Sequence, residues 1–248
     1  MNDIRYKKLA NNLLTYSVNI KKGDNILIEI LGEDIKHIKN VLRKQIGENI
    51  EICDKDTKKS YICEIEKIEE KSILTKIIEE LQSNDNKIEV DIYQGLPKAD
   101  KMELIIQKSV ELGANAIIPV EMKRCVVKIA TKDEMKKITR WQKIAESAAK
   151  QSGRDTIPEI KNIVNVEKIA QLINKYDSVL VAYENEKENT IKQELLKLKQ
   201  YKKTEQKIKI GVVIGPEGGL EEKDVELLKQ KGAKIVTLGN RILRTETV

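Results

Sequence analysis

From residue 88 onward, the sequence alternates short apolar segments typical of buried strands with longer segments of helical periodicity. Repeated strand–helix units of this kind fold into a mostly parallel sheet with helices on both faces. The sequence therefore predicts an α/β domain in this part of the chain. Strands are expected at residues 88–93, 116–120, 178–184 and 208–214, and helices at 131–151, 166–174 and 190–202, between Asp100 and Gly113, and before Gly232.

Two glycine-bearing loops leave neighbouring strands of this predicted sheet. The first is Gly215-Pro216-Glu217-Gly218-Gly219, and the second spans residues 238–247. Because open α/β sheets bind ligands at the carboxyl ends of their strands, we expect one site formed by both loops. The first loop carries an acid and no lysine, which suits a neutral ribose or a cationic sulfonium better than a triphosphate. Neither a dinucleotide-binding nor a P-loop motif occurs in the sequence. Taken alone, the first loop could also be an ordinary strand-to-helix turn that binds no ligand.

The N-terminal part of the chain has a different pattern. Segments 25–30, 49–54, 61–68 and 72–78 alternate apolar and polar residues, which predicts a small antiparallel sheet or barrel. A short helix is expected at residues 34–44, with Ile35, Ile38, Val41 and Leu42 on one side. The four turn-forming residues 83–86 are the best candidate for a linker between the two parts.

Charge, cysteine and histidine content narrow the class of protein. A net charge of +6 favours an anionic partner. Only seven of the 46 basic residues are arginines, and their planar donors suit phosphate or base contacts. Three cysteines without a C-x-x-C motif indicate free thiols, and the single histidine, His37, is expected to be structural, so no metal site is predicted. Without an 18-residue apolar run, the protein is expected to be soluble and cytoplasmic, with no membrane partner.

Several motifs resemble those of the RsmE family of bacterial ribosomal RNA methyltransferases, in the SPOUT (trefoil-knot) superfamily. They are residues 37–43 (HIKNVLR), 101–103 (KME), 107–113 (QKSVELG), 124–125 (RC), 141–145 (WQKIA) and 151–154 (QSGR), followed by both loops. The resemblance implies a PUA-like β-barrel RNA-binding domain in residues 1–82. It also implies a knotted, Rossmann-like SPOUT methyltransferase domain in residues 87–248. In the family a further helix completes the knot, and because this chain ends at Val248, that helix is expected to be missing from it.

The same resemblance implies methyl transfer from S-adenosylmethionine to N3 of a specific uridine in 16S rRNA of the small ribosomal subunit. It also implies a homodimer. The cofactor is expected among three loops. One follows the strand at 178–184, and the other two are the glycine-bearing loops. The residues assigned to cofactor binding are Tyr183, Glu184, Gly215, Glu217, Gly218, Gly219, Leu238, Gly239, Arg241, Ile242 and Leu243.

Candidate catalytic and RNA-binding residues follow from the chemistry of the target. Uracil N3 carries a proton, so the site must supply a base or stabilise the anionic ring while water removes that proton. We favour the second route, with Arg244 holding the target phosphate or a uracil carbonyl and Glu246 as a possible base or orienter. Arg43, Arg124 and Arg154 are candidates for RNA contacts, and surface salt bridges are the alternative for Arg124 and Arg154.

Two other functions stay open from the sequence. One is a non-catalytic RNA-binding protein that has kept the fold and lost turnover. The other is a related SPOUT enzyme that acts on transfer RNA or on a ribose 2′-oxygen, because nothing in the chemistry of these residues separates that oxygen from uridine N3.

Overall fold

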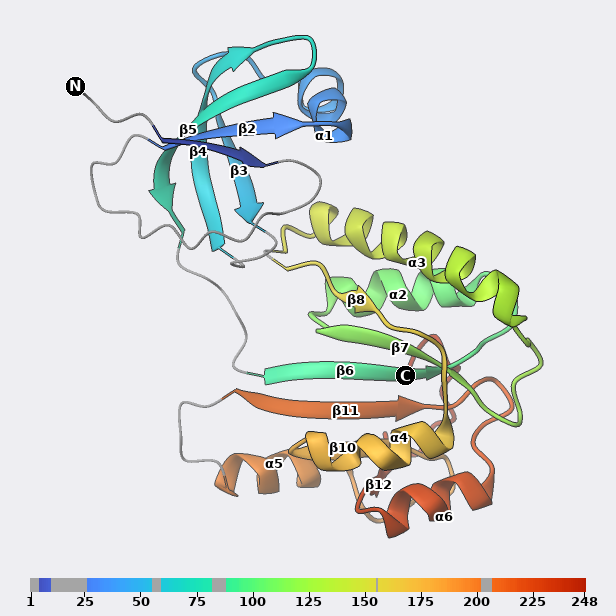
Figure 1. Ribbon diagram of the computed structural model, residues 1–248. Coiled ribbons are helices and arrows are strands. Elements are labelled where there is room, and N and C mark those ends of the chain that lie inside the picture. The colour runs from blue at the N-terminus through green and yellow to red at the C-terminus, as the bar shows by residue number, and fades with distance from the viewer. Residues whose placement is uncertain (1–4, 10–25, 55–58, 82–87, 155, 202–206) are drawn as a thin grey trace. The chain divides into compact units, whose positions relative to one another are not determined.

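The computed structural model describes the chain except for residues 1–4, 10–25, 55–58, 82–87, 155 and 202–206 (Figure 1). The side chains of His37 and Cys53 also lie outside the described part, so their expected roles are not addressed by it. The chain divides into two compact units, Met1–Asp85 and Asn86–Val248. Each unit is described by itself below.

Unit 1 is built on a sheet whose described strands follow the order β1-β2-β5-β4-β3. The pairs among β2, β5, β4 and β3 are antiparallel, as the alternating pattern predicts, whereas β1 pairs with β2 in parallel. No pattern in the sequence predicted β1. The strands are β1 (Arg5–Leu9), β2 (Ile26–Leu31), β3 (Asn49–Asp54), β4 (Lys59–Ile68) and β5 (Ser72–Glu80).

The helix expected at residues 34–44 is shorter and changes type. It consists of α1 (Glu33–Lys36) and a π-helical turn, η1 (His37–Val41). Ile35 and Ile38 are buried in the core of unit 1, but Val41 and Leu42 are 66% and 49% exposed, so the predicted stripe was wrong at these two positions. A π-helical turn holds more residues than an α-helical turn, and it therefore rotates the later side chains away from the core.

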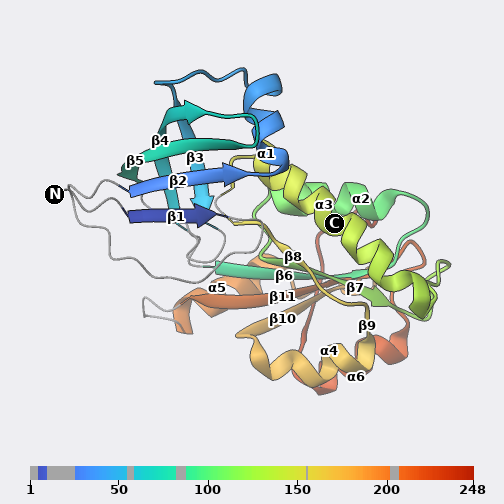
Figure 2. The same cartoon turned by 45° about the horizontal axis from the view of Figure 1, so that its top comes forward.

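Unit 2 contains a parallel sheet in which the described strands follow the order β12-β10-β11-β6-β7-β8, with β9 also pairing with β7. Strands β6 and β11 run side by side in two views of the molecule (Figures 1 and 2), and β10 pairs with β11 on the side away from β6. The strands are β6 (Ile88–Gly95), β7 (Ala116–Glu121), β8 (Glu159–Ile160), β9 (Val164–Asn165), β10 (Ser178–Ala182), β11 (Ile208–Ile214) and β12 (Lys234–Val236).

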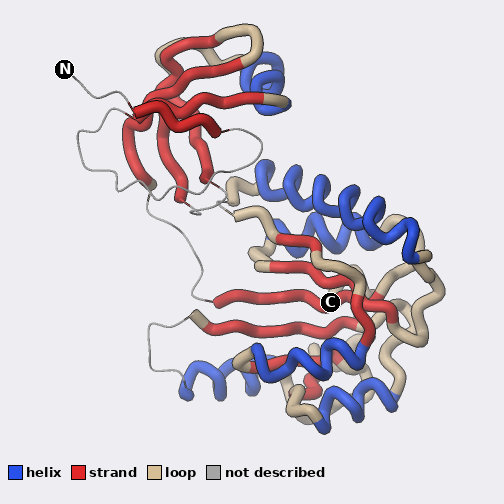
Figure 3. The backbone as a smooth tube through the Cα atoms, viewed as in Figure 1, coloured by secondary structure: helices blue, strands red, loops and turns tan. Residues whose placement is uncertain are grey.

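Helices cover both faces of this sheet, and the tube view separates the helical layers from the strands (Figure 3). Val179 and Val181 of β10 join the core shared with α4 and α6, whereas Leu180 points to the opposite face and packs with α5. The helices are α2 (Lys101–Glu111), α3 (Thr131–Gln151), α4 (Val166–Leu172) continued by η2 (Ile173–Lys175), α5 (Ile191–Tyr201) and α6 (Glu222–Gln230).

The start of α2 is held by backbone hydrogen bonding and by a contact with α3. Asp100 makes no side-chain cap hydrogen bond among the described residues, and its carbonyl instead accepts from the Glu103 N–H at 3.0 Å. The Glu103 carboxylate pairs with Arg140 of α3 at 2.6 Å. Glu103 therefore joins two helices instead of closing the first turn of one.

Candidate cofactor-binding site

Strands β10, β11 and β12 end at the same edge of unit 2, and the loops that follow them enclose a cavity of about 510 Å³. Small-molecule sites occupy roughly 300–1,000 Å³. All the residues that the resemblance assigned to cofactor binding line this cavity, as does Arg244. Glu246 does not line the cavity, but it contacts Lys101, and Lys101 does line it.

Close backbone packing fixes the loop at residues 215–219 against β6. A Cβ added at Gly95, the last residue of β6, would lie 2.7 Å from Cδ of Pro216. Gly219 has a φ of +71°, and a Cβ there would lie 2.5 Å from a carboxylate oxygen of Glu184. A larger residue at Gly95 would force the loop away from β6, and one at Gly219 would strain the backbone and displace the Glu184 carboxylate. These two glycines therefore set the shape of the cavity wall.

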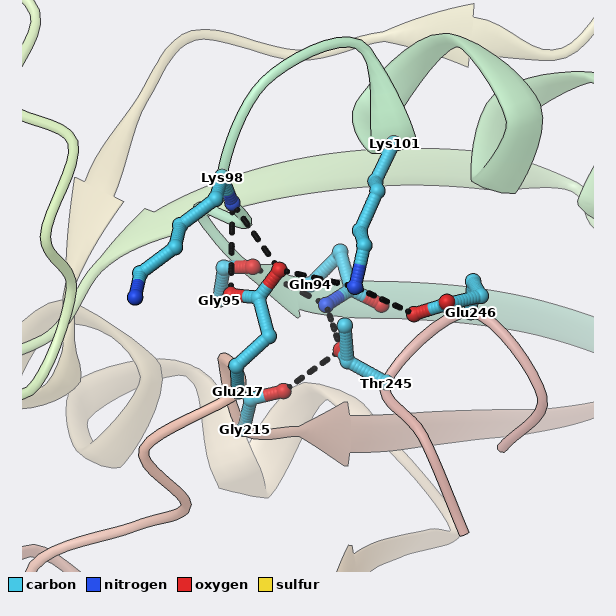
Figure 4. A network of polar contacts seen from close by, with 8 residues as sticks. All are labelled: Gln94, Gly95, Lys98, Lys101, Gly215, Glu217, Thr245 and Glu246. Carbon is cyan, nitrogen blue, oxygen red and sulfur yellow. Dashed lines mark hydrogen bonds and ion pairs between the residues drawn. The ribbon is translucent and has the colours of Figure 1, made fainter.

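Glu217 ties this loop to the segment that leads into α2. Its carboxylate oxygens accept from the backbone N–H of Lys98 at 3.1 and 3.2 Å. The Lys101 ammonium lies 3.2 Å from Oε1 of Glu217 and 3.1 Å from Oε2 of Glu246. Figure 4 shows Lys101 reaching from the start of α2 to a point between the two carboxylates.

Thr245 fixes the segment at residues 238–248 to β6 and to the start of the loop that follows β11. Its hydroxyl donates to the carbonyl of Gly215 at 2.7 Å and accepts from Nε2 of Gln94 at 2.8 Å (Figure 4). Gln94 is fully buried in β6, and Thr245 is 7% exposed. The two glycine-bearing loops are thus joined by one hydroxyl as well as by Lys101.

Sequence reasoning missed Lys101, Gln94 and Thr245 as site residues. Lys101 and Thr245 both lie inside motifs that carried the resemblance, so a signal for these two was present. Gln94 lies at the end of a predicted strand and had no signal of its own. Its role depends on contacts with residues far along the chain, which no local pattern encodes.

The charges at this junction shift the pKa of each group. Partial burial alone would raise the pKa of Glu217, yet hydrogen bonds from backbone N–H groups and the Lys101 ammonium hold it below its usual value. A backbone N–H and Lys101 likewise lower the pKa of Glu246, and the carboxylates of Glu246 and Glu217 raise the pKa of Lys101. All three groups are charged at neutral pH. A carboxylate with a lowered pKa is a weak base, so this geometry favours an orienting role for Glu246.

The predicted arginines lie in different environments. Arg244 and Arg241 are exposed at the cavity, and Arg124 donates to the carbonyl of Gly218 at 3.1 Å. Arg43, in unit 1, is exposed with a φ of 53°. Arg154 is half-buried and donates to the carbonyls of Val110 and Ala114 at 3.0 and 2.7 Å. Arg154 therefore binds the C-terminal end of α2, and the RNA contact expected for it stays a prediction.

Comparison with known proteins identifies the family to which the chain belongs. Residues 84–248 match the model of the RNA methyltransferase domain family, and residues 30–78 match that of the RNA methyltransferase PUA domain. The chain belongs to this RNA methyltransferase family. The match confirms the resemblance noted from the motifs. It also confirms the predicted α/β fold class with an N-terminal PUA-like domain.

Individual members of the family cover most of the chain. Ribosomal RNA small subunit methyltransferase E of Bacillus subtilis is 39% identical over 222 residues, which cover 88% of this chain and 84% of that protein. The protein of the same name from Aquifex aeolicus is 30% identical, with 92% of each chain covered. A crystal structure of the Neisseria gonorrhoeae protein bound to S-adenosyl methionine is 28% identical, with a TM-score of 0.74 and coverage of 99% of this chain and 93% of that one.

The residues of the cavity fit a methyl donor of this type. Gly219 and Gly239 both have positive φ and present backbone without a side chain, so a flat base can approach their amides and carbonyls. Ile242 and Leu243 leave 89% and 37% of their surfaces exposed at the cavity, which provides apolar cover for an aromatic ring. The acids Glu184 and Glu217 are compatible with a sulfonium and would repel a triphosphate.

The described residues contain no group of three or more His, Cys, Asp or Glu side chains that could hold a metal ion. In the same part of the chain, no helix combines the length and the apolar character needed to span a membrane.

Proposed function

We propose that the protein transfers a methyl group from S-adenosylmethionine to N3 of a specific uridine in 16S rRNA of the small ribosomal subunit. The observation that carries this proposal is the single cavity formed by the three loops in a chain of the RNA methyltransferase family. The Bacillus subtilis and Neisseria gonorrhoeae relatives are named as ribosomal RNA small subunit methyltransferases, and the latter binds S-adenosyl methionine.

The residues of this chain position the target and its charge. The bound cofactor supplies an electrophilic methyl group. Arg244 holds a phosphate or a uracil carbonyl at the cavity and stabilises the negative charge that the ring gains when N3 loses its proton. In this proposal the N3 proton is lost to solvent water, and Glu246, a charged carboxylate paired with Lys101, orients the segment after β12. The target base must be unpaired or flipped out of a stack to reach the cavity.

RNA binding is mainly electrostatic in this proposal. The chain carries a net charge of +6, and it has one Trp, seven Tyr and no Phe, too few aromatic residues for a base-stacking platform. Arg43 in unit 1 and Arg124 beside the first loop are exposed and serve as backbone contacts. The active form is a homodimer that acts in the cytoplasm, where small ribosomal subunits are assembled.

The test is methylation of small-subunit RNA with S-adenosylmethionine labelled in its methyl group. Digestion to nucleosides and mass mapping should place the label on N3 of one uridine. Label on a ribose 2′-oxygen, or label found only when transfer RNA is supplied, would replace this function with one of the related activities. Binding of RNA and cofactor without transfer would indicate a non-catalytic protein.

A further inference from the structure

We propose that Lys101 is a positioning residue that holds the two glycine-bearing loops at the spacing needed to bind the methyl donor. The identity of the ligand rests on the proposed function, but the role of Lys101 rests on geometry. Lys101 lies at the first turn of α2, outside both loops, and its ammonium contacts one carboxylate from each.

The two carboxylates come from different loops, and of the two only Glu217 lines the cavity. Glu217 belongs to the loop after β11, and Glu246 belongs to the segment after β12. Both are charged at neutral pH, and their pKa values are lowered partly by the same ammonium. Without that ammonium, two like charges on two loops would repel each other. Loss of the Lys101 charge should therefore move the two loops apart.

The environment of Glu246 makes the contact more than an ordinary surface pair. Its side chain is 15% exposed, and Oε2 is enclosed and has no hydrogen-bond partner among the described residues. The ion pair with Lys101 at 3.1 Å is thus the contact that compensates this oxygen. Isolated exposed pairs contribute little, but an enclosed carboxylate that loses its cation must move or be protonated.

A second set of contacts shows where the movement would occur. Thr245 is fixed to Gln94 and Gly215, so the segment keeps one attachment next to Glu246 when Lys101 is changed. Glu217 likewise keeps the backbone N–H of Lys98. The fold of unit 2 should therefore survive the loss of Lys101. Only the spacing between residues 217 and 246, and with it the shape of the cavity, should change.

The experiment measures cofactor affinity by titration calorimetry, independently of turnover. Lys101→Met removes the charge and keeps most of the side chain, and it should weaken binding of S-adenosylmethionine by about tenfold, or about 1.4 kcal/mol. Lys101→Arg restores the charge and should recover most of the affinity. The thermal unfolding midpoint without cofactor and the affinity for RNA should stay close to those of the unchanged protein.

Lys123→Met is the matched control. Lys123 pairs with Glu221, shortly after the same loop, but its side chain is 70% exposed and it contacts one carboxylate at 3.1 Å. This variant loses the same charge and should change cofactor affinity by less than about twofold.

Equal loss of affinity in Lys101→Met and Lys123→Met would show an effect of net charge and overturn the proposal, as would unchanged affinity in Lys101→Met. If Lys101→Met does not fold, Glu246→Ala provides the second variant, because it removes the contact between Lys101 and the segment after β12, and unchanged cofactor affinity in that variant would also overturn the proposal. Absence of binding in the unchanged protein is a different result. It would refute the proposed cofactor, and with it the function, before any variant is compared.

Discussion

Arg244 combines a fixed backbone with an exposed side chain at the cavity. Its carbonyl accepts the N–H groups of Thr247 at 2.8 Å and Val248 at 3.1 Å, which hold the turn in place. Its guanidinium forms no hydrogen bond or ion pair with the described part of the chain. A planar donor held in this way is available to a phosphate or to a uracil carbonyl.

Arg244→Ala should separate binding from turnover. We expect kcat to fall by about a hundredfold or more, as when a donor that stabilises transition-state charge is removed. The dissociation constant for S-adenosylmethionine should change by less than about twofold, because the cavity walls are held by Thr245 and Lys101. Turnover assays and calorimetry on the same preparation test this. If kcat and the affinity for S-adenosylmethionine fell together, Arg244 would instead be a residue that shapes the cofactor cavity.

Ala99 is a residue whose backbone is strained next to the site. It has a φ of 53°, and it lies between Lys98, which donates to Glu217, and the start of α2. Residues with a Cβ rarely adopt this conformation. Ala99→Gly should raise the free energy of unfolding by up to about 1 kcal/mol, since relief of strain exceeds the added freedom of the unfolded chain. Urea denaturation measures the change, and a lower free energy of unfolding would show that Ala99 is not strained.

At the scale of the elements, α2 links the cofactor site to the rest of unit 2. Its first residue, Lys101, contacts both loops, and its last turn is held by Arg154, which lies just beyond the end of α3. The Arg154 guanidinium donates to the carbonyls of Val110 and Ala114, which lie at or beyond the helix end. Backbone carbonyls at a helix end need such partners when water is excluded.

Arg154→Met should therefore lower stability and leave RNA binding unchanged. Loss of hydrogen bonds to two carbonyls should reduce the free energy of unfolding by about 1–3 kcal/mol. Arg124→Met is the comparison, because Arg124 is exposed and should affect RNA affinity more than stability. Urea denaturation and filter binding of RNA distinguish the two. Weaker RNA binding with full stability in Arg154→Met would instead support the RNA contact expected from the sequence.

Elements with strong local patterns could be predicted closely. Strand β11 and helix α3 have the expected bounds, because a continuous apolar run and a long helical periodicity are local properties. β1 was missed, since its five residues, RYKKL, are mostly polar and it pairs with β2 in parallel. The short strands β8 and β9 were missed because two residues form no pattern. The π-helical turn of η1 also lies beyond rules based on α-helical spacing.

At the scale of the whole molecule, basic charge should govern binding to RNA. The chain has 46 basic and 40 acidic residues, and its few aromatic residues leave little for base stacking. The logarithm of the RNA affinity should fall linearly with the logarithm of the salt concentration. If three arginines contact phosphates, the affinity should drop by roughly tenfold or more between 50 and 200 mM salt. Filter binding across this range measures the slope. A flat response would exclude the basic residues as the main RNA contacts.

The site was predictable to the extent that it follows from topology. Parallel strands place the loops after β10, β11 and β12 at one edge, so residues far apart in sequence line one cavity. The assignment of particular residues within those loops came from the resemblance. The contacts among Lys101, Glu217 and Glu246 were not predictable, because they depend on side-chain positions set by three separate segments.

The bonds from Thr245 to Gln94 and Gly215 have a consequence for how the protein is made. Translation delivers residues in order, so the strands from β6 to β12 leave the ribosome before Thr245 does. Until that threonine emerges, a nascent chain can pair its strands but has no anchored second wall for the methyl donor. The cavity is therefore the last part of unit 2 that the chain can complete, because its second loop is anchored by a residue that follows every strand.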